Sequence, residues 1–420
     1  MTASSKRNDY VHLVAEGQGM DVNVYAFIKR RGILRILIIN EYVKKRGAEQ
    51  IVADQKKLFS QYNNNVQCLC FDIGYANNVP EGYDIIHISQ KSKLVFDFFV
   101  YCKLRRYIVA YNPEIIIVHN IFSSPTTVYR ALKGFKTIQV IHDYKIVCPT
   151  SWCVHKNMPH TICEGYKCKK CIKLCSNINS RLKVMVNLWL VRKCEKLRKK
   201  YIKVCISPSE RLNKYLLDYG YKSVCINNPF QTDLKTEKYT RNSNELRLIY
   251  AGAVTQEKGV LEFCNAIINN YKNITLDIYG KIADDCTEEV KKIIGCSNKR
   301  IKFCGHINHE ELITKYGEYD YLIVPSIWMD NYPTAILEAM GCGIVVIGTN
   351  RGGIPEMLAE GRGFIYKYGD NKDLYNICDM LFRLSEEDYN TLRKRANKYV
   401  YENNSFDNYY KQIDDLMKQL

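Results

Sequence analysis

The sequence predicts an α/β protein of two domains, each built on its own parallel sheet. The chain has 420 residues, which is more than one ordinary hydrophobic core accommodates. Short apolar runs of strand length alternate with amphipathic helical stretches, and this alternation is typical of βαβ units. A polar stretch, FQTDLKTEKYTRNSNE, divides the strands into two series, so we interpret it as an interdomain linker.

The apolar runs place the domain boundaries. We expect a first domain over residues 34–229, a linker over 230–244, a second domain over 245–384 and terminal helices over 385–420. Residues 1–33 are polar with weak periodicity, and we treat them as an N-terminal extension. The expected strands of the first domain are LRILIIN, VQCLCFD, DIIHIS, EIIIVHN, TIQVIHD, KVCIS and SVCINN. Those of the second are LRLIYAG, ITLDIYG, IKFCGHI, YLIVPS, IVVIGTN and GFIYKYG.

Charge and cysteine content restrict the environment and the partners. The formal net charge is +17, which suits an anionic membrane, a nucleic acid or a phosphorylated substrate. The 18 cysteines are scattered through buried strands and loops without an export signal, so we expect a reducing cytoplasmic location. The sequence has no apolar run long enough to span a bilayer.

The most informative segment covers residues 325–358 and reads PSIWMDNYPTAILEAMGCGIVVIGTNRGGIPEML. It predicts a buried strand, a loop, a helix that begins near Pro333, a second buried strand and a Gly-rich turn. Ligands of an open parallel sheet bind beyond the carboxyl ends of its strands. A helix N-terminus there offers N–H groups to a phosphate, and Glu338 can accept hydrogen bonds from sugar hydroxyls. The segment therefore favours a diphosphate flanked by sugars.

The same segment resembles the signature of the retaining family 4 glycosyltransferases, which have the GT-B fold. Asp330 stands where that family usually has the first glutamate of an E-x7-E pair, and Glu338 matches the second. The resemblance implies two Rossmann-like domains facing across a cleft, transfer with retention of configuration, and no obligatory metal. The other matching residues are Pro325, Ser326, Trp328, Pro333, Ala339, Gly343, Gly352, Gly353 and Glu356.

The resemblance also assigns donor-binding roles in the second domain. The stretch LIYAGAVTQEKG matches the family's G-R-x-x-x-x-K-G at Gly252, Lys258 and Gly259, but Ala253 replaces the arginine. Lys258 would bind the diphosphate, with Arg351 as one substitute for the missing cation. Backbone N–H groups near Pro333, Thr334 and Ala335 would contribute, Glu338 would hold the ribose, and Asp330 would contact the donor sugar. Gly280 and the segment Gly305-His306-Ile307 would frame the base.

In the first domain the resemblance indicates His142 and Gly47. His142 ends the strand TIQVIHD, and the equivalent family histidine lies at the interdomain cleft near the donor sugar and phosphate. His119 is a weaker candidate, for which packing is the expected role. Gly47 and Glu49 match the G-G-x-E loop of the family, whereas Arg46 replaces its first glycine.

A Cys-rich insert covers residues 148–175. Its spacing permits a structural zinc ion at Cys163, Cys168, Cys171 and Cys175, but the second pair is irregular for a zinc finger. The alternative is a set of free thiols, and we expect no disulfide in the cytoplasm.

A basic amphipathic stretch, SRLKVMVNLWLVRKCEKLRKKYIK, follows the insert. It can lie on an anionic membrane surface, or pack on the sheet with a solvated basic face; the stretch KLVFDFFVYCKLRRY is a second membrane candidate. The combined hypothesis is a cytoplasmic, peripheral-membrane glycosyltransferase that uses a nucleotide-diphosphate sugar and a glycan or lipid-linked acceptor. Alternatives are a catalytically weak relative that acts as a binding protein, and a nucleotide-sugar epimerase. We expect no nucleic-acid partner, since only the charge favours one.

Overall fold

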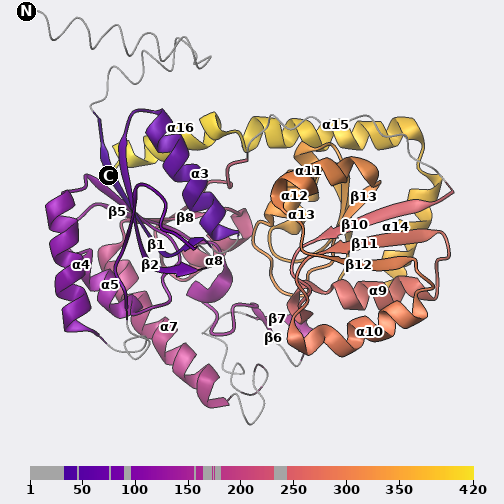
Figure 1. Ribbon diagram of the computed structural model, residues 1–420, viewed down its shortest axis with the longest axis horizontal. Coiled ribbons are helices and arrows are strands. Elements are labelled where there is room, and N and C mark those ends of the chain that lie inside the picture. Colours follow the sequence, from indigo (N-terminus) through magenta and orange to yellow (C-terminus); the bar gives the residue numbers. More distant parts are fainter. Residues whose placement is uncertain are drawn as a thin grey trace, which may run out of the picture.

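The structure is a computed structural model that describes residues 33–44, 47–74, 77–88, 96–155, 158–163, 173, 175, 181–230 and 244–420. The expected N-terminal extension up to residue 32 and the linker over 231–243 lie outside the described residues. The chain forms two α/β lobes that lie side by side (Figure 1). The predicted α/β class with two parallel sheets is confirmed.

The first lobe has a parallel sheet in which the described strands follow the order β3-β2-β1-β4-β5-β8-β9. Helices α3, α4, α5, α7 and α8 belong to this lobe (Figure 1). β1 is buried at nearly every position, as expected for a central parallel strand. The strands are β1 (Arg35–Lys44), β2 (Asn65–Gly74), β3 (Tyr83–Ile85), β4 (Ile115–Val118), β5 (Thr137–Val140), β8 (Val204–Ser207) and β9 (Ser223–Cys225). The helices are α3 (Ala48–Gln61), α4 (Phe98–Tyr111), α5 (Pro125–Ala131), α7 (Arg181–Tyr201) and α8 (Glu210–Asp218).

The second lobe repeats the same design. Its described strands are all parallel and follow the order β12-β11-β10-β13-β14-β15. The strands are β10 (Leu246–Ala251), β11 (Ile274–Tyr279), β12 (Ile301–Gly305), β13 (Tyr321–Val324), β14 (Val345–Thr349) and β15 (Gly363–Tyr366). The helices are α9 (Val260–Ile268), α10 (Thr287–Cys296), α11 (His309–Lys315), α12 (Thr334–Gly341), α13 (Ile354–Leu358) and α14 (Asn371–Arg383). In both lobes the sheet order reverses beside its first strand, and ligands bind at such a switch point.

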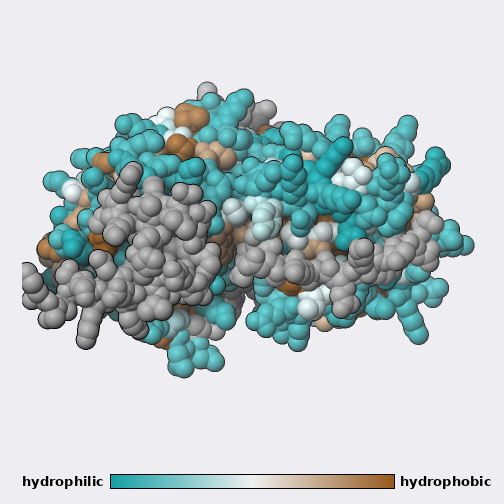
Figure 2. Space-filling view, turned by 90° about the horizontal axis from the view of Figure 1, so that it is seen from above, coloured by the Kyte–Doolittle hydropathy of each residue, from teal (hydrophilic) through white to brown (hydrophobic). Residues whose placement is uncertain are grey.

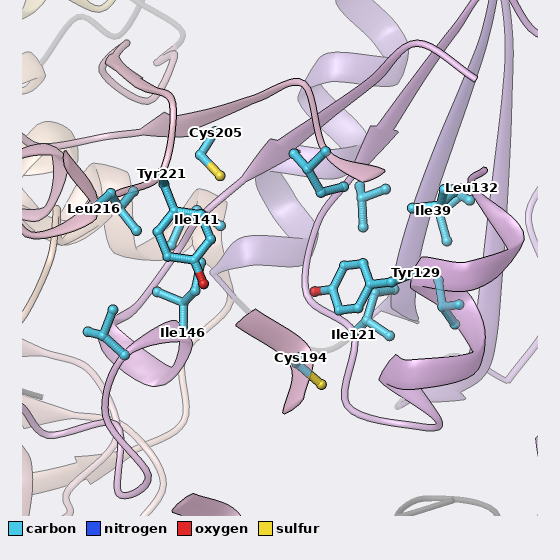
Figure 3. Packing of buried hydrophobic residues seen from close by; sticks show 14 of the residues in the cluster. Ile39, Ile121, Tyr129, Leu132, Ile141, Ile146, Cys194, Cys205, Leu216 and Tyr221 are labelled. Carbon is cyan, nitrogen blue, oxygen red and sulfur yellow. The ribbon is translucent and has the colours of Figure 1, made fainter. Parts of the chain in front are cut away.

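Each sheet is covered on both faces by apolar clusters. In the first lobe, Ile39 and Tyr129 pack with Ile121, Leu132, Ile141 and Ile146 on one face (Figure 3). Cys194 and Cys205 are buried in the same cluster, so these two thiols serve as small apolar side chains. The cores hold the strands rigidly and leave chemistry to the loops at the strand ends.

The C-terminal helices connect the two lobes. α15 (Glu386–Asn403) packs against α12 of the second lobe, and α16 (Phe406–Lys418) reaches the first lobe beside α3 (Figure 1). Tyr409, Ile413 and Met417 of α16 are buried in the same cluster as Ile36 and Ile38 of β1. The last helix is therefore part of the core of the first domain.

The two crossings between the lobes are tied to each other. The Phe230 N–H donates to the Asn404 carbonyl at 2.7 Å. The Asn404 side chain donates to the Asn228 carbonyl at 2.8 Å. Asn404 is fully buried, so this tie between the two crossings is shielded from water.

The face seen from above is predominantly hydrophilic over the described residues (Figure 2). Within the described part of the chain, no helix combines the length and apolar character required to cross a membrane.

Candidate functional site

Two loops of the second domain meet at the carboxyl edge of its sheet. Lys258 ends the short helix η5 (Gln256–Lys258) after β10, and Asp330 lies in the loop between β13 and α12. The Lys258 ammonium lies 2.7 Å from the Asp330 carboxylate, which also accepts from the Ser326 hydroxyl at 3.0 Å. The structure therefore brings together two of the residues that the sequence predicts for catalysis.

Backbone contacts hold these two loops together. The Glu257 carbonyl accepts from the N–H groups of Ile327 and Trp328 at 2.9 and 3.3 Å. Gly259 has a φ of +70°, and a Cβ there would lie 2.1 Å from the Pro325 carbonyl oxygen. Lys258 also lies 5.0 Å above the Trp328 ring centroid, a cation–π distance. The position of the ammonium is thus fixed from several sides.

The Gly-rich turn after β14, at Gly352 and Gly353, packs against the backbone of the Asp330 loop. A Cβ on Gly352, whose φ is +56°, would lie 1.8 Å from the Asp330 carbonyl oxygen. A Cβ on Gly353 would lie equally close to the carbonyl oxygen of Asn331. The GGIPE match thus has a steric cause, because only glycine lets this turn approach the Asp330 loop.

Gly352→Ala is expected to destabilise the fold by about 2 kcal/mol, since it adds both a clash and a left-handed alanine. It also displaces Asp330, so activity falls with stability. Denaturant unfolding measures the first effect and donor turnover the second. Gly295→Ala in α10 is the matched control: a Cβ there meets nothing within 4 Å, so the protein should be unchanged or slightly stabilised. Equal stability of Gly352→Ala and the parent would refute the steric account.

The helix α12 begins beside this pair, with Pro333 as its N-cap. The N–H groups of its first turn, including those of Thr334 and Ala335, have no acceptor inside the helix by geometry, and they carry the positive end of the helix dipole. One turn later the Glu338 carboxylate is 13% exposed and lies 3.4 Å from the Tyr316 hydroxyl and 3.4 Å from His309 Nε2. Hydrogen bonding to Glu338 raises the pKa of His309. These long contacts leave Glu338 room to accept from a ligand.

The ends of β10, β11 and β12 lie close together, and Gly280 has no room for a side chain. A Cβ on Gly280 would lie 1.7 Å from the Gly252 carbonyl oxygen, and the Gly280 N–H donates to the Gly305 carbonyl at 2.7 Å. His306 follows Gly305 and is exposed. The structure thus places Gly252, Gly280 and Gly305 side by side at the edge where the base was expected.

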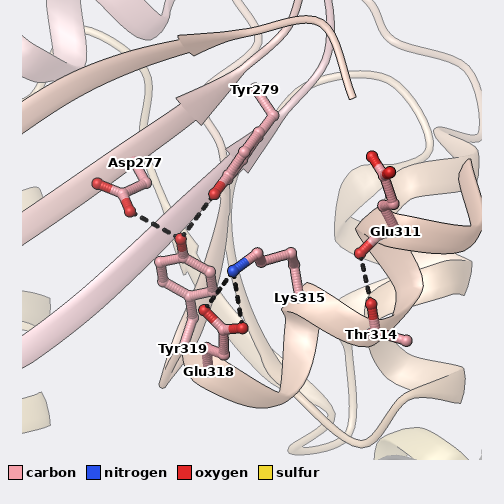
Figure 4. Close-up of polar contacts among 7 residues, drawn as sticks. All are labelled: Asp277, Tyr279, Glu311, Thr314, Lys315, Glu318 and Tyr319. Atoms are coloured by element: carbon pink, nitrogen blue, oxygen red, sulfur yellow. Dashed lines mark hydrogen bonds and ion pairs between the residues drawn. The ribbon is translucent and has the colours of Figure 1, made fainter. Parts of the chain in front are cut away.

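A polar cluster braces the same edge (Figure 4). The Tyr319 hydroxyl donates to Asp277 at 2.7 Å and lies 3.2 Å from the Tyr279 hydroxyl. Lys315 pairs with Glu318 at 2.8 Å on the surface beside it. Tyr279 immediately precedes Gly280, so this network fixes the end of β11.

The loop of Asp330 also makes the contacts with the first domain. The Asn331 side chain accepts from the Ser209 hydroxyl and donates to the His142 carbonyl at 3.2 Å. The Met329 N–H donates to the Trp152 carbonyl at 2.9 Å. His142, which follows β5, therefore lies at the interdomain boundary two residues from Val140.

Glu356 of α13 caps a helix of the other domain. Its carboxylate accepts from the N–H groups of Glu210 and Arg211 at the start of α8, at 3.2 and 3.3 Å. Burial raises the pKa of Glu356 to about 7, although these two backbone hydrogen bonds oppose the shift. The carboxylate is thus held across the boundary at the cost of desolvation.

Glu356→Gln is expected to change how stability depends on pH. The folded pKa of about 7 exceeds the ordinary value, so the folded state binds more protons than the unfolded state between about pH 4.5 and 7. The free energy of unfolding of the parent therefore falls as pH rises through this window, whereas the variant lacks this decline. Relative to the parent, the variant should gain on the order of 1–3 kcal/mol between pH 5 and 8, measured by denaturant unfolding. Glu402→Gln, at an exposed surface pair, should show no such gain; a pH-independent difference for Glu356→Gln would contradict the assignment.

The remaining predicted residues lie apart from this pair or outside the described chain. Gly47 precedes α3 with a φ of +56° and is exposed, whereas Arg46, Cys168 and Cys171 are outside the described residues. Hydrogen bonds from the Cys153 and Cys163 thiols lower the pKa of Cys148, so these three sulfurs are close together. Cys175 lies 3.6 Å from His155 Nδ1. Among described residues, no group of three or more histidines, cysteines and acids is arranged to hold a metal, so the zinc site stays a prediction.

Sequence reasoning missed the residues that join the domains. No sequence motif marks Asn331, Ser209 or the residues that are hydrogen-bonded to His142. The only signal was indirect: Asn331 sits between two motif residues, Asp330 and Pro333, on a loop predicted to reach a ligand.

The fold has counterparts among solved structures. Solved structures that share the fold include HepE of Anabaena in complex with UDP, at 17% identity and a TM-score of 0.69 over 92% of this chain and all of that one. WaaG, a glycosyltransferase involved in lipopolysaccharide biosynthesis, gives a TM-score of 0.63 at 12% identity over 91% of this chain and 99% of that one. The architecture is therefore the GT-B fold of glycosyltransferases.

Sequence comparisons agree with this class. Residues 231–403 match the family model of glycosyl transferases group 1, and this match spans the second domain. An uncharacterized 41.2 kDa protein in the cps region of Klebsiella pneumoniae is 22% identical over 79% of both chains. The lipopolysaccharide 1,2-N-acetylglucosaminetransferase of Salmonella typhimurium is 24% identical over 41% of this chain and 48% of its own length.

Proposed function

We propose that this protein transfers a hexose or N-acetylhexosamine from a nucleotide-diphosphate sugar to a glycan or lipid-linked glycan, with retention of configuration, in the synthesis of a cell-surface polysaccharide. The relatives support this, because one lies in a cps region and another is a lipopolysaccharide glycosyltransferase. The observation that carries the proposal is the Lys258–Asp330 pair at the N-terminus of α12. A cation, the positive end of a helix dipole and a carboxylate able to accept from sugar hydroxyls at one edge of the sheet support this proposal.

The roles follow from charge and reach. The Lys258 ammonium would stabilise the negative charge that develops on the departing nucleotide diphosphate, together with the first N–H groups of α12. When a donor binds, the diphosphate would share Lys258 with Asp330, and the carboxylate would accept from hydroxyls of the donor sugar. Glu338, one turn into α12, would hold the ribose.

Although Ala253 stands where the family has an arginine, Arg351 can supply a second cation to the site. Arg351 follows β14 at the same carboxyl edge and lies 4.9 Å from the Tyr368 ring centroid. The nearby Arg211 of the first domain contributes to lowering the pKa of Arg351, although burial is the larger cause. Two guanidinium groups from opposite domains thus lie near each other, and a bound diphosphate would relieve their repulsion.

The test is thermal shift of the purified protein against UDP-, GDP- and ADP-sugars, with the free nucleotides as controls. A ligand that binds the native state raises the melting temperature, so a selective rise names the donor base and sugar. An NMR assay of the anomeric product then tests retention. Donor that binds without turnover in the presence of acceptor glycans would favour the binding-protein alternative, and an isomerised free sugar nucleotide would favour the epimerase.

We also propose that the first domain works at an anionic membrane surface, where a lipid-linked acceptor resides. α7 carries Leu182, Met185 and Trp189, which are 47–73% exposed. The rest of the helix includes many basic residues and the single acid Glu195. α5 packs against both α7 and α4, and α4 exposes Phe98 and Phe99 near its start. Basic and apolar groups on one domain favour an interfacial site.

Trp189→Glu is expected to reduce binding to vesicles of anionic phospholipid by roughly 10-fold, because it removes an apolar contact and adds a repelled charge. Co-sedimentation with anionic and with zwitterionic vesicles measures it. Tyr401→Glu on α15, also exposed, serves as the control on the other domain. Equal binding of the parent to both vesicle types would remove the membrane part of the proposal.

A further inference from the structure

A line of buried polar side chains crosses the first domain from α16 to the interdomain boundary. The Gln55 amide of α3 donates to the Tyr409 hydroxyl of α16. The other end of the Gln55 amide lies 2.8 Å from His119 Nε2. His119 Nδ1 then lies 2.8 Å from His142 Nε2. Gln55, His119 and Tyr409 are buried, so the line is shielded from solvent as far as His119, and the half-buried His142 ends it at the interdomain boundary.

The orientation of the Gln55 amide assigns the protons along this line. The Gln55 oxygen that faces His119 can only accept, so His119 Nε2 carries a proton. In a neutral imidazole the other nitrogen is then bare, so His119 Nδ1 accepts from His142 Nε2–H. It follows that the second ring nitrogen of His142, Nδ1, carries no proton. The direction of every hydrogen bond in the line thus follows from the orientation of one amide.

The surroundings keep both imidazoles neutral. Burial lowers the pKa of His119 well below its usual range, and the adjacent His142 lowers it further. Burial likewise lowers the pKa of His142 to about 4. The two rings stack with centroids 5.1 Å apart, so a charge on one would be repelled by a charge on the other.

We propose that His119 is a positioning residue which holds His142 as its Nε2–H tautomer, so that His142 offers a hydrogen-bond acceptor, Nδ1, to the donor. An unprotonated nitrogen repels phosphate oxygens and accepts from a hydroxyl group. His142 Nδ1 therefore accepts a hydrogen bond from a hydroxyl of the donor sugar and does not contact the diphosphate. This role rests on the proposed glycosyl transfer, but the tautomer itself does not.

The tautomer is tested by two-bond 1H–15N correlation NMR of the full-length protein labelled at its eight histidines. His142→Gln identifies the His142 pattern by its loss. We expect an Nε2-protonated ring in the parent at pH 7 and in His119→Asn, whose amide oxygen can still accept. We expect a mixed tautomer in His119→Leu and in Gln55→Met, a second variant should His119→Leu fail to fold. A parent ring protonated at Nδ1, or at both nitrogens, would overturn the proposal, whether or not a donor is ever found.

The sugar contact is tested by comparing the intact donor with the free nucleoside diphosphate that inhibits it. In His119→Leu the KM for the donor should rise by roughly 3- to 10-fold, while the inhibition constant of the nucleotide stays within about twofold of the parent. His119→Asn should restore the KM. Thr137→Val, which loses a 3.3 Å hydrogen bond at the opposite end of β5, controls for general loosening of that strand. A parallel loss of nucleotide affinity would place His142 on the phosphate and refute this part.

Discussion

Lys258→Ala is expected to slow sugar transfer by about 100-fold or more, with the fold unchanged. The scale is that of one electrostatic contact removed from a developing charge. Steady-state kinetics should show the loss mainly in kcat, since the leaving diphosphate gains its charge in the transition state.

Two further variants make this result specific. Lys291→Ala removes an ammonium from an ion pair of the same 2.7 Å length, but one that is exposed to solvent on both sides, so its activity should be unchanged. Lys258→Arg keeps the positive charge but places it on a planar guanidinium group, so it should recover part of the transfer rate. Near-normal turnover by Lys258→Ala would refute the site, whatever the other variants do.

Glu338→Ala is expected to weaken binding of the nucleotide-sugar by about 100-fold, an effect on binding more than on the chemical step. Its carboxylate is mostly buried, and it lies 3.4 Å from both the Tyr316 hydroxyl and His309 Nε2. A ribose with two hydroxyls can replace these long contacts with short ones, each charge-assisted. Calorimetry of nucleoside diphosphate binding measures the loss.

The ribose assignment has its own discriminating measurement. The parent should bind a ribonucleoside diphosphate much more tightly than its 2′,3′-dideoxy form, and Glu338→Ala should bind the two about equally. Glu288→Ala, on the exposed side of α10, should keep the preference of the parent. If Glu338→Ala retained that preference, the ribose would have to be held elsewhere.

Features that depend on local sequence patterns could be predicted from the sequence alone. Buried parallel strands appear as apolar runs such as those of β1 and β13, so the two sheets were predictable from period and length. The Asp330 to Glu338 spacing was also readable, because a loop and one helical turn fix it. Glycines such as Gly352 could be selected by pattern, and the structure adds the reason, a backbone that comes within contact of Asp330.

Contacts between residues that are far apart in the sequence could not be predicted from it. Gln55 and Tyr409 are hydrogen-bonded although they are separated by nearly the whole chain, and neither has a local signature. Glu356 matched a motif, yet its cap on α8 requires knowing that the two domains face each other. His119 was expected to pack, and its burial agrees, but a histidine in a strand end does not disclose which nitrogen it presents.

The placement of α16 bears on how the protein is made. Its residues Tyr409, Ile413 and Met417 complete an apolar cluster whose other members include residues of β1, β4 and α3. A ribosome releases these elements much earlier. At ordinary rates of synthesis, the first domain waits on the order of 10–40 s for this helix after β9 has been made. During that interval the apolar side of β1 and α3 is uncovered, so the nascent chain presents a binding surface for a chaperone. If synthesis stopped before α16, the second domain could still fold, but the first domain would lack part of its core.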